Sequence, residues 1–255
     1  MNFDFCDISE HTLSITDSLL TSNMQTQFNL HYWLYVTALI FSFEFLSLSN
    51  AAAESECKAF FAAEQASDHV RLVADWVVNS HDNHGMPFVI LDKKQTKIFV
   101  FDADGQILGA TQALLGMTVG DYDTEGVGNK SLAQIPPQHR ITPAGRYVAH
   151  LGKNLHGGLY LWIDYDAGLA IHAVVNVPGQ KRLERLASQD PKEHRISWGC
   201  INVPVNFFDS LICPIFKNKG FVYILPETKS PVDFFGITSA NSISKNEATS
   251  AAKSL

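Results

Sequence analysis

The stretch that decides the fold is "PFVILDKKQTKIFVFDADGQILGATQALLG", residues 87–116. It contains three runs of apolar, β-branched and aromatic residues, at 87–92, 97–102 and 106–116. The tetrapeptide KKQT separates the first two runs, and Ala103-Asp104-Gly105, a strong signal for a hairpin turn, separates the next two. Short strands joined in succession by tight turns predict an antiparallel β-meander.

Similar runs continue downstream, and helical patterns flank them. Further strands are expected at 145–152, 159–165, 168–175 and 221–226. Residues 68–80 predict an amphipathic helix with Asp68 as its N-cap, and short helices are expected at 181–187 and 204–212. The apolar face of the first helix consists of Val70, Val73, Ala74 and Val77. The fold class that follows is mainly β with flanking helices (α+β).

An N-terminal export signal is expected in residues 1–53. The run "LHYWLYVTALIFSFEFLSL", residues 30–48, is the most apolar in the chain, and small residues follow it up to Ala53, the expected cleavage point. No Lys or Arg precedes this run and about 30 residues lie upstream of it, although a start at Met24 would shorten that segment. The alternative is an uncleaved anchor with transient membrane contact, which Glu44 and the shortness of the run disfavour.

Composition divides the remainder into three parts. Residues 54–86 form a helical segment, 87–226 the main domain, and 227–255 a tail rich in Ser, Ala, Asn and Thr that we expect to be disordered. Within the main domain, residues 117–140 are rich in Gly, Asp, Pro and Gln. This predicts a long loop over the sheet, and long loops in compact domains often line sites.

Overall charge and composition describe a globular protein with one principal domain. The 255 residues are 46% hydrophobic and 18% charged, and the net charge is −7. Residues 1–53 hold five acidic residues and no Lys or Arg, so the rest of the chain carries only −2. A nearly neutral body lacks the basic surface that phosphate backbones require, and a nucleic-acid partner is therefore not expected.

Cleavage after Ala53 would leave three cysteines, Cys57, Cys200 and Cys213. An odd number in an exported protein suggests one free, reactive thiol beside a disulfide. Cys213 could pair with Cys57, although its apolar neighbours favour a small buried residue. The sequence has no Cys/His ligand spacing and no glycine-rich phosphate loop, so neither a metal nor a cofactor is expected.

The segment "SWGCINVP", residues 197–204, has the features of a nucleophile turn. A thiol attacks as thiolate, and Pro204 at the first position of a helix would put Cys200 just before a helix N-terminus that favours the anion. Gly199 permits a tight turn whose N–H groups can point at a developing oxyanion, and Ser197 could form a hydrogen bond across the turn.

The base is expected on another strand. In "GLAIHAVV", residues 168–175, alternation puts His172 on the face opposite Ile171, among apolar neighbours that keep an imidazole neutral. A buried histidine with a purely structural role is the alternative. His150, His156 and His194 remain candidates, although His194 lies in a charged loop with nothing evident to hold its ring.

Two separated motifs resemble the L,D-transpeptidase catalytic domain over residues 88–226. They are His172 followed by Ser197-Trp198-Gly199-Cys200-Ile201-Asn202, and Thr142-Pro143-Ala144-Gly145 with Tyr147. The resemblance implies a β-sandwich catalytic domain with Cys200 as nucleophile and His172 as base, with Gly199 supplying oxyanion donors and Ser197 and Asn202 shaping the turn. In this sequence the gap from His172 to Ser197 is longer than usual, which indicates an insertion, and Trp198 stands where histidine is common.

The activity implied is transpeptidation of peptidoglycan stem peptides in the periplasm or cell envelope. Cys200 would attack a diaminopimelate carbonyl, release D-alanine and hold a thioester until a second stem's amine resolves it. Carbapenem acylation of Cys200 is a further implication. The alternatives are an L,D-carboxypeptidase, in which water resolves the thioester, and a wall-binding protein without activity.

Residues near the turn could also contact substrate. Trp198 could form an aromatic wall beside the nucleophile or pack under the turn as core, and Asn202 and Arg195 are further candidates for substrate binding. The insertion also carries Lys181, Arg182 and Arg185, which could meet substrate carboxylates. A solvated surface helix balanced by acidic residues is the favoured interpretation of this segment. Those acidic residues are Glu184, Asp190 and Glu193.

Overall fold

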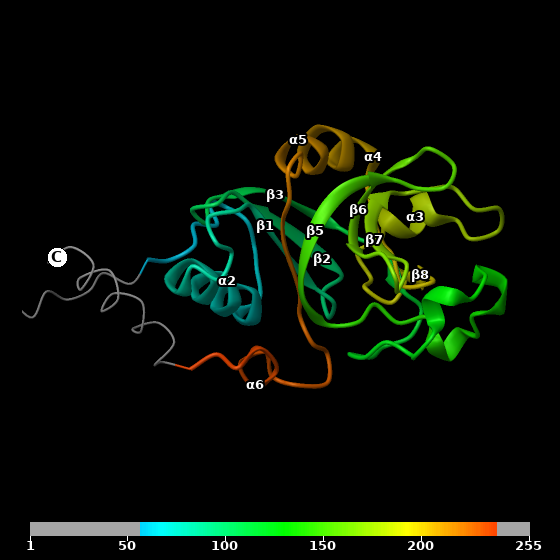
Figure 1. Ribbon diagram of the computed structural model, residues 1–255, viewed down its shortest axis with the longest axis horizontal. Helices are drawn as coiled ribbons and strands as arrows, with labels where there is room; N and C mark the ends of the chain where they lie inside the picture. The colour runs from blue at the N-terminus through cyan, green and yellow to red at the C-terminus, as the bar shows by residue number, and fades with distance from the viewer. Residues whose placement is uncertain (1–56, 239–255) are drawn as a thin grey trace, which may run out of the picture. The chain divides into compact units, whose positions relative to one another are not determined.

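The computed structural model describes residues 57–238 (Figure 1). Its strands are β1 (Phe88–Asp92), β2 (Lys97–Phe101), β3 (Ile107–Gln112), β4 (Leu115–Gly116), β5 (Gly145–Lys153), β6 (Leu159–Asp164), β7 (Leu169–Ala173), β8 (Arg195–Ser197), β9 (Ile201–Val203) and β10 (Gly220–Ile224). The helices are α2 (Asp68–Ser80), α3 (Arg182–Leu186), α4 (Val205–Phe207), the π-helical η4 (Phe208–Ile212), α5 (Cys213–Ile215) and α6 (Pro231–Phe235). Three 3₁₀ turns are η1 (Val127–Asn129), η2 (Leu132–Gln134) and η3 (Pro137–His139). The expected mainly β architecture with flanking helices is confirmed.

One large sheet forms the body of the molecule, in the order β3-β2-β1-β10-β5-β6-β7-β9, while β4 and β8 form a separate pair. The meander β1-β2-β3 is antiparallel, as the turns between its strands predict. The long strand β5 belongs to both halves of the sheet, because residues 145–149 pair with β10 and residues 150–153 pair with β6. The curved β5 of Figure 1 thus carries the sheet from one half into the other, which encloses a core as a sandwich does.

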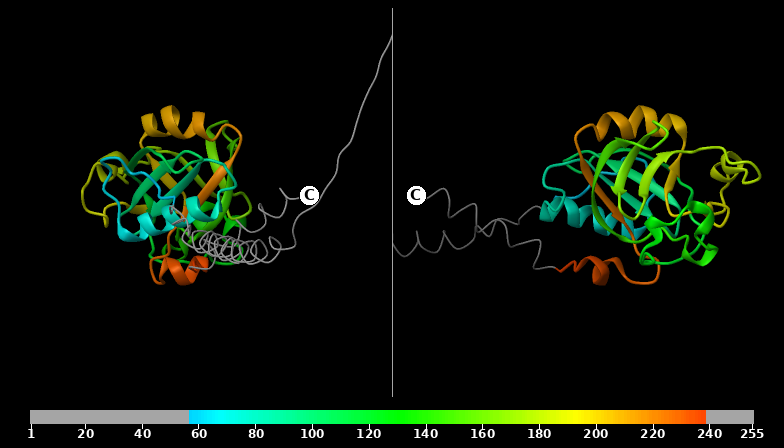
Figure 2. Two further views of the ribbon diagram at one scale, coloured as in Figure 1. Left: turned by 90° about the vertical axis from the view of Figure 1, so that its left-hand side faces the viewer. Right: turned by 45° about the vertical axis from the view of Figure 1, so that its right-hand side comes forward.

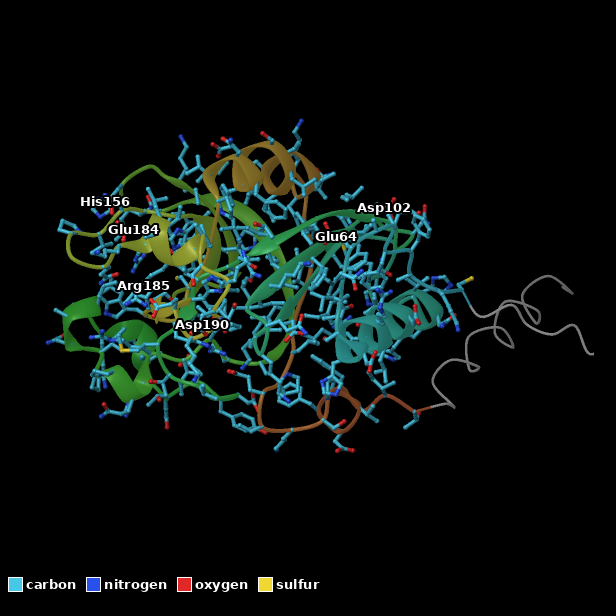
Figure 3. All side chains as sticks on the ribbon, turned by 180° about the vertical axis from the view of Figure 1, so that it is seen from behind. Glu64, Asp102, His156, Glu184, Arg185 and Asp190 are labelled. Atoms are coloured by element: carbon cyan, nitrogen blue, oxygen red, sulfur yellow. The ribbon has the colours of Figure 1, made fainter. Side chains whose placement is uncertain are left out.

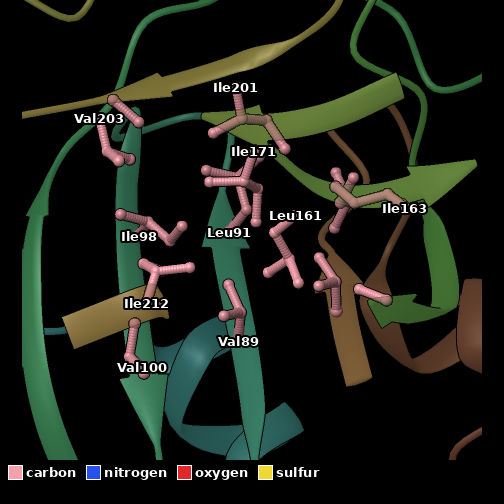
Figure 4. Packing of buried hydrophobic residues seen from close by; sticks show 14 of the residues in the cluster. Val89, Leu91, Ile98, Val100, Leu161, Ile163, Ile171, Ile201, Val203 and Ile212 are labelled. Carbon is pink, nitrogen blue, oxygen red and sulfur yellow. The ribbon is translucent and has the colours of Figure 1, made fainter. Parts of the chain in front are cut away.

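Alternation along β1 separates two hydrophobic cores. Val89 and Leu91 face the inner core, which lies between the two halves of the sheet and includes side chains of the helical segment 205–215 (Figure 4). Phe88 and Ile90 face an outer core that α2 covers. In Figure 2, α2 and the helical segment accordingly lie on opposite sides of the sheet. Because β1 is buried on both faces, its run is continuously apolar rather than alternating with polar residues.

Helix α2 begins one residue away from the expected boundary. Ser67, not Asp68, is the N-cap, and its Oγ accepts a hydrogen bond from the Val70 N–H at 3.3 Å. The same hydroxyl donates to Asp92 Oδ2 at 2.6 Å, which ties the start of the helix to the end of β1. The apolar face of the helix is buried as its spacing predicts.

The expectation of disorder throughout 227–255 is wrong for residues 227–238. The Asp121 carboxylate accepts hydrogen bonds from the N–H groups of Glu227 (2.6 Å) and Thr228 (2.8 Å), and Phe235 of α6 stacks on Trp76 of α2. Local composition misses this order because the stabilising partners lie more than 100 residues away in the chain. Residues 239–255 and 1–56, with the expected signal at 30–48, lie outside the described residues.

A buried lysine joins the sheet to the loop between β4 and β5, residues 117–144, which we call the cover loop. The fully buried Lys93 Nζ donates to the carbonyls of Gly120 (2.6 Å) and Thr142 (3.0 Å) and to Asp121 Oδ1 (3.0 Å), and it lies 3.4 Å from Glu227 Oε1. Both ends of the cover loop and the start of the C-terminal segment are therefore fixed to one ammonium group.

Replacing Asp121 by Asn should lower the free energy of unfolding by about 3–5 kcal/mol, because it leaves Lys93 and Arg195 to share the single carboxylate of Glu227 and so leaves one buried positive charge uncompensated. Burial alone would raise the pKa of Asp121, but hydrogen bonds from Thr228, Glu227 and Lys93 outweigh burial and hold the pKa well below its usual range. This stabilisation is present above the unfolded-state pKa and is lost as pH falls through the folded-state pKa. Urea unfolding of both proteins from pH 7 downwards should show the difference narrowing below about pH 4.

Glu184→Gln is the matched control for charge removal, since Glu184 is exposed and pairs only across the surface with Lys181. It should change stability by less than about 0.5 kcal/mol. Equal effects of the two substitutions, or a difference that does not vary with pH, would contradict the role given to Asp121.

Candidate active site

Cys200 lies in the turn between β8 and β9, half-buried. The expected position just before a helix N-terminus is wrong, because β9 separates Cys200 from α4 and Pro204 is the N-cap residue of that helix. The influence of a helix dipole falls off within the first turn, so α4 does not activate the sulfur directly. Pro204 is compatible with the end of a short strand as well as with the start of a helix. The local sequence therefore does not show that a strand separates Cys200 from the helix.

Ser197 stabilises the turn between β8 and β9 through two hydrogen bonds. Its buried Oγ donates to the Cys200 carbonyl at 2.6 Å and accepts the Gly199 N–H at 3.1 Å. The Gly199 N–H, expected to face an oxyanion, is therefore occupied by Ser197. Gly199 itself has φ +139°, and a Cβ there would lie 2.8 Å from the Ile141 carbonyl oxygen, so the turn requires glycine at this position.

Thr142 explains why the two motifs occur together. Its buried hydroxyl donates to the Gly199 carbonyl at 2.7 Å and accepts the Gly116 N–H at 2.9 Å. The Thr-Pro-x-Gly element thus fixes the cysteine turn from the end of the cover loop. Gly145 contributes by leaving room for the Tyr147 ring, which lies 2.5 Å from where a Gly145 Cβ would be.

His172 faces away from the inner core, as its strand alternation predicts. Parallel pairing of β7 with β9 puts it opposite Asn202. Its Nδ1 lies 2.8 Å from the Ala173 carbonyl, so Nδ1 carries the hydrogen and Nε2 is the acceptor, and its ring stacks on Tyr160 with 4.3 Å between centroids. Burial lowers the pKa of His172, the Ala173 bond opposes this, and the Arg182 charge lowers the pKa further. The imidazole is therefore neutral and able to accept a proton.

Cys200 and His172 border the same cavity, of about 310 Å³, which we call the α3-side cavity. Within residues 57–238 no hydrogen bond joins the sulfur to the imidazole, and the Cys200 thiol donates instead to the Gly168 carbonyl at 3.2 Å. Burial raises the pKa of Cys200, although a backbone bond from Ala170 and the Arg182 charge oppose the shift. In the resting site the thiol and the imidazole are therefore both uncharged.

The other candidate histidines do not border this cavity. His194 is buried, with Nδ1 against the Thr96 hydroxyl and Nε2 3.1 Å from the Ser188 carbonyl, so its ring is firmly held despite the charged sequence around it. His150 and His156 are exposed. Among the four candidates, only His172 shares a cavity with Cys200.

A second, smaller cavity of about 80 Å³, the loop-side cavity, lies between Cys200 and the cover loop. Trp198, Leu132 and Gly168 border both cavities, so the Trp198 side chain forms a wall beside the sulfur at their junction. The Trp198 ring has two arginines near its faces, with Arg140 Cζ at 5.2 Å and Arg182 Cζ at 5.5 Å from its centroid. In Figures 1 and 2 the cover loop and α3 lie at the same end of the sheet.

Arg182 is the residue that the surface-helix interpretation missed. It is buried, its Nη1 donates to Asn202 Oδ1 at 2.8 Å, and its Nε donates to Gln180 Oε1 at 2.7 Å. The signal was the i,i+4 spacing of Arg182 and Leu186, which form the buried face of α3. The surface interpretation is correct for Lys181 and Glu184, and Figure 3 labels Glu184 and Arg185 on this helix.

Arg195 and Asn202 lie in different surroundings. Asn202 is fully buried, borders the α3-side cavity and has its Nδ2 3.5 Å from His172 Nε2. Arg195 forms an ion pair with Glu227 and donates to the Lys93 carbonyl at 2.8 Å. It therefore belongs to the surroundings of the buried lysine and borders neither cavity.

The cysteines of the described chain carry no disulfide. Cys57, Cys200 and Cys213 are free, and Cys213 packs against the inner core as a small apolar residue. Residues 57–238 contain no group of three or more His, Cys, Asp or Glu side chains arranged to hold a metal ion. No helix in this part of the chain is long and apolar enough to cross a membrane.

The raised pKa of Cys200 predicts slow alkylation at neutral pH. In a Cys57→Ser, Cys213→Ser background, the rate of Cys200 modification by iodoacetamide should be slower at pH 7 and level off at a higher pH than in the unfolded chain, because the thiolate is the reacting form. Mass spectrometry of the modified peptide gives the rate, and the same chain unfolded in urea supplies the reference profile. A rate already at its plateau at pH 7 would mean a preformed thiolate and would contradict the uncharged resting site.

Comparisons with known proteins give only matches of low similarity. The sequence matches no protein-family model and no curated protein. Among solved structures, the helical cell shape determining protein Pgp2 from Campylobacter jejuni is 18% identical with a TM-score of 0.38, covering 61% of this chain and 55% of that chain. LD transpeptidase LdtMt1 in complex with imipenem is 14% identical with a TM-score of 0.32, covering 55% of this chain and 58% of that chain. This chain spans less than two thirds of either protein, and such values assign neither activity nor substrate.

Proposed function

We propose that the protein is a cysteine-dependent L,D-transpeptidase that acts on peptidoglycan stem peptides in the cell envelope. The observation that carries the proposal is the shared cavity of Cys200 and His172, with the acceptor nitrogen of the imidazole on the side of Asn202. The motif resemblance around both residues supplies the substrate class.

The chemistry begins with the thiol leaving the Gly168 carbonyl. As the sulfur attacks the diaminopimelate carbonyl, His172 Nε2 takes the thiol proton, and it then gives that proton to the nitrogen of the departing D-alanine. The carbon–nitrogen bond breaks and a thioester remains on Cys200. An incoming amine attacks the thioester, loses its proton through His172, and the sulfur leaves to become a thiol again.

The contacts that hold the His172 ring support these proton transfers. The Nδ1 bond to Ala173 and the stack on Tyr160 hold one tautomer and one ring orientation. The oxyanion needs donors as well, and the Gly199 N–H can serve only after the Ser197 hydroxyl releases it.

The two cavities suit a reaction with two substrates. An acyl donor would fill the α3-side cavity, which holds about 310 Å³, and the acceptor would approach through the loop-side cavity. The second candidate function, an L,D-carboxypeptidase, is favoured by the small size of the loop-side cavity, about 80 Å³, which admits water more readily than a stem peptide.

Turnover of disaccharide tetrapeptide by the purified full chain, followed by mass spectrometry, distinguishes the functions. Cross-linked dimers indicate a transpeptidase, tripeptide alone indicates a carboxypeptidase, and unchanged substrate would refute both and favour a wall-binding protein.

Cys200→Ala should abolish product formation, because the acyl chain is carried on the sulfur, while the melting temperature changes little for a half-buried side chain in a turn. His172→Gln should lower kcat/KM by about 100-fold or more through loss of the base. His156→Gln, at an exposed position, is the matched control and should keep full activity. Turnover by the Cys200 variant would disprove the nucleophile.

A further inference from the structure

Two residues that border the α3-side cavity have buried hydrogen-bond donors without acceptors. Within residues 57–238, four buried side-chain polar atoms have no partner, and two of them are Arg182 Nη2 and Trp198 Nε1. Both residues border this cavity together with Cys200 and His172. Leaving a buried donor unpaired is costly, and more so when the donor is charged, so these atoms indicate a place where a ligand supplies the acceptor.

The charge of Arg182 is also uncompensated. Its two hydrogen-bond partners, Asn202 Oδ1 and Gln180 Oε1, are neutral amide oxygens. Ion pairs on the same segment join Lys181 to Glu184 and Arg185 to Glu193, whereas Arg182 has no ion-pair partner in the part of the chain that the structure describes. Arg182 as a whole is 4% exposed, and a buried guanidinium that lacks a counter-ion favours an anionic ligand over a neutral one.

The shape of the anion follows from the guanidinium and its surroundings. Asn202 fixes Nη1 and Gln180 fixes Nε, which leaves Nη2 to meet the ligand. The walls contributed by Leu132, Tyr160 and Val175 are mainly apolar, which strengthens a charge-assisted bond by lowering the local dielectric constant. A planar carboxylate on a short aliphatic peptide group matches both features.

We propose that Arg182 binds a free carboxylate of the acyl-donor peptide and thereby selects donors that carry one beside the scissile bond. The inference rests on the proposed function and names the residue that sets its substrate preference. Two carboxylates have this chemistry, that of the departing D-alanine and the free carboxylate of the diaminopimelate side chain. Arg182 acts on substrate binding and takes no proton.

The test compares three donors with the full wild-type chain: the disaccharide tetrapeptide, the same peptide with its terminal D-alanine amidated, and the same peptide with its diaminopimelate carboxylate amidated. One amidated donor should lose at least about tenfold in kcat/KM, the effect of a charge-assisted hydrogen bond, and its identity names the carboxylate. Equal kcat/KM for all three donors would overturn the proposal without any variant.

Arg182→Gln should abolish the preference, with the acid and the affected amide turned over at equal rates, and Arg182→Lys should restore part of it. Lys181→Gln, which removes a neighbouring positive charge that is 73% exposed, should keep the full preference. Because Arg182 also bonds Gln180 and Asn202, melting temperatures are compared alongside. A folded Arg182→Gln chain that retains the wild-type preference would refute the assignment.

Failure of the function and failure of this inference give different results. Absence of turnover with every donor refutes the proposed function alone. The carboxylate site is then tested by calorimetric binding of the same three peptides to the Cys200→Ala chain. The site is supported if one amidated peptide binds the Cys200→Ala chain more weakly than the unmodified peptide does, and if this difference disappears when Arg182→Gln is added. Equal binding of all three peptides, or no binding of any of them, overturns it.

Discussion

One buried ammonium group fixes the geometry on which the candidate site depends. Lys93 Nζ bonds the Thr142 carbonyl, and the Thr142 hydroxyl in turn bonds the Gly199 carbonyl next to Cys200. The same ammonium holds Gly120 and Asp121 at the other end of the cover loop. A buried charge is costly unless all its partners are in place. The positions of the cover loop and of the cysteine turn therefore depend on the same set of interactions. This favours one arrangement of the loop over the many that its polar sequence allows.

The candidate site itself is built so that neither reacting group is charged at rest. Burial disfavours the anion on Cys200 and the cation on His172 alike. A thiolate–imidazolium pair formed in advance would require the desolvation of two charges. In an uncharged pair, the charges separate only when a carbonyl carbon is present for the sulfur to attack. The thiol rests on the Gly168 carbonyl in the meantime. In the proposed function, such a site would react with bound substrate more readily than with small electrophiles in solution.

The sequence predicts strands well and tertiary partners poorly, for a physical reason. Apolar, β-branched and aromatic runs and the turn residues between them locate β1, β2 and β3, because strands that are buried on both faces are apolar at successive positions. The hydroxyl of Thr142 meets Gly199, 57 residues later, through a contact that no local pattern encodes. The helix-dipole expectation for Cys200 failed because three residues of strand fit between the cysteine and Pro204. The ordered structure of residues 227–238 was not predicted because the residues that contact this segment are distant in the sequence.

The segment between β7 and β8, which carries α3, contributes residues to the candidate site. Arg182 reaches Asn202, whose amide nitrogen lies 3.5 Å from the His172 acceptor nitrogen and 3.2 Å from the Cys200 carbonyl oxygen. An anion bound by Arg182, as proposed, would therefore act on a residue that contacts both His172 and the backbone of Cys200. Because hydrogen bonds in a chain polarise one another, substrate recognition and proton transfer would, in the proposed function, be linked through one amide side chain.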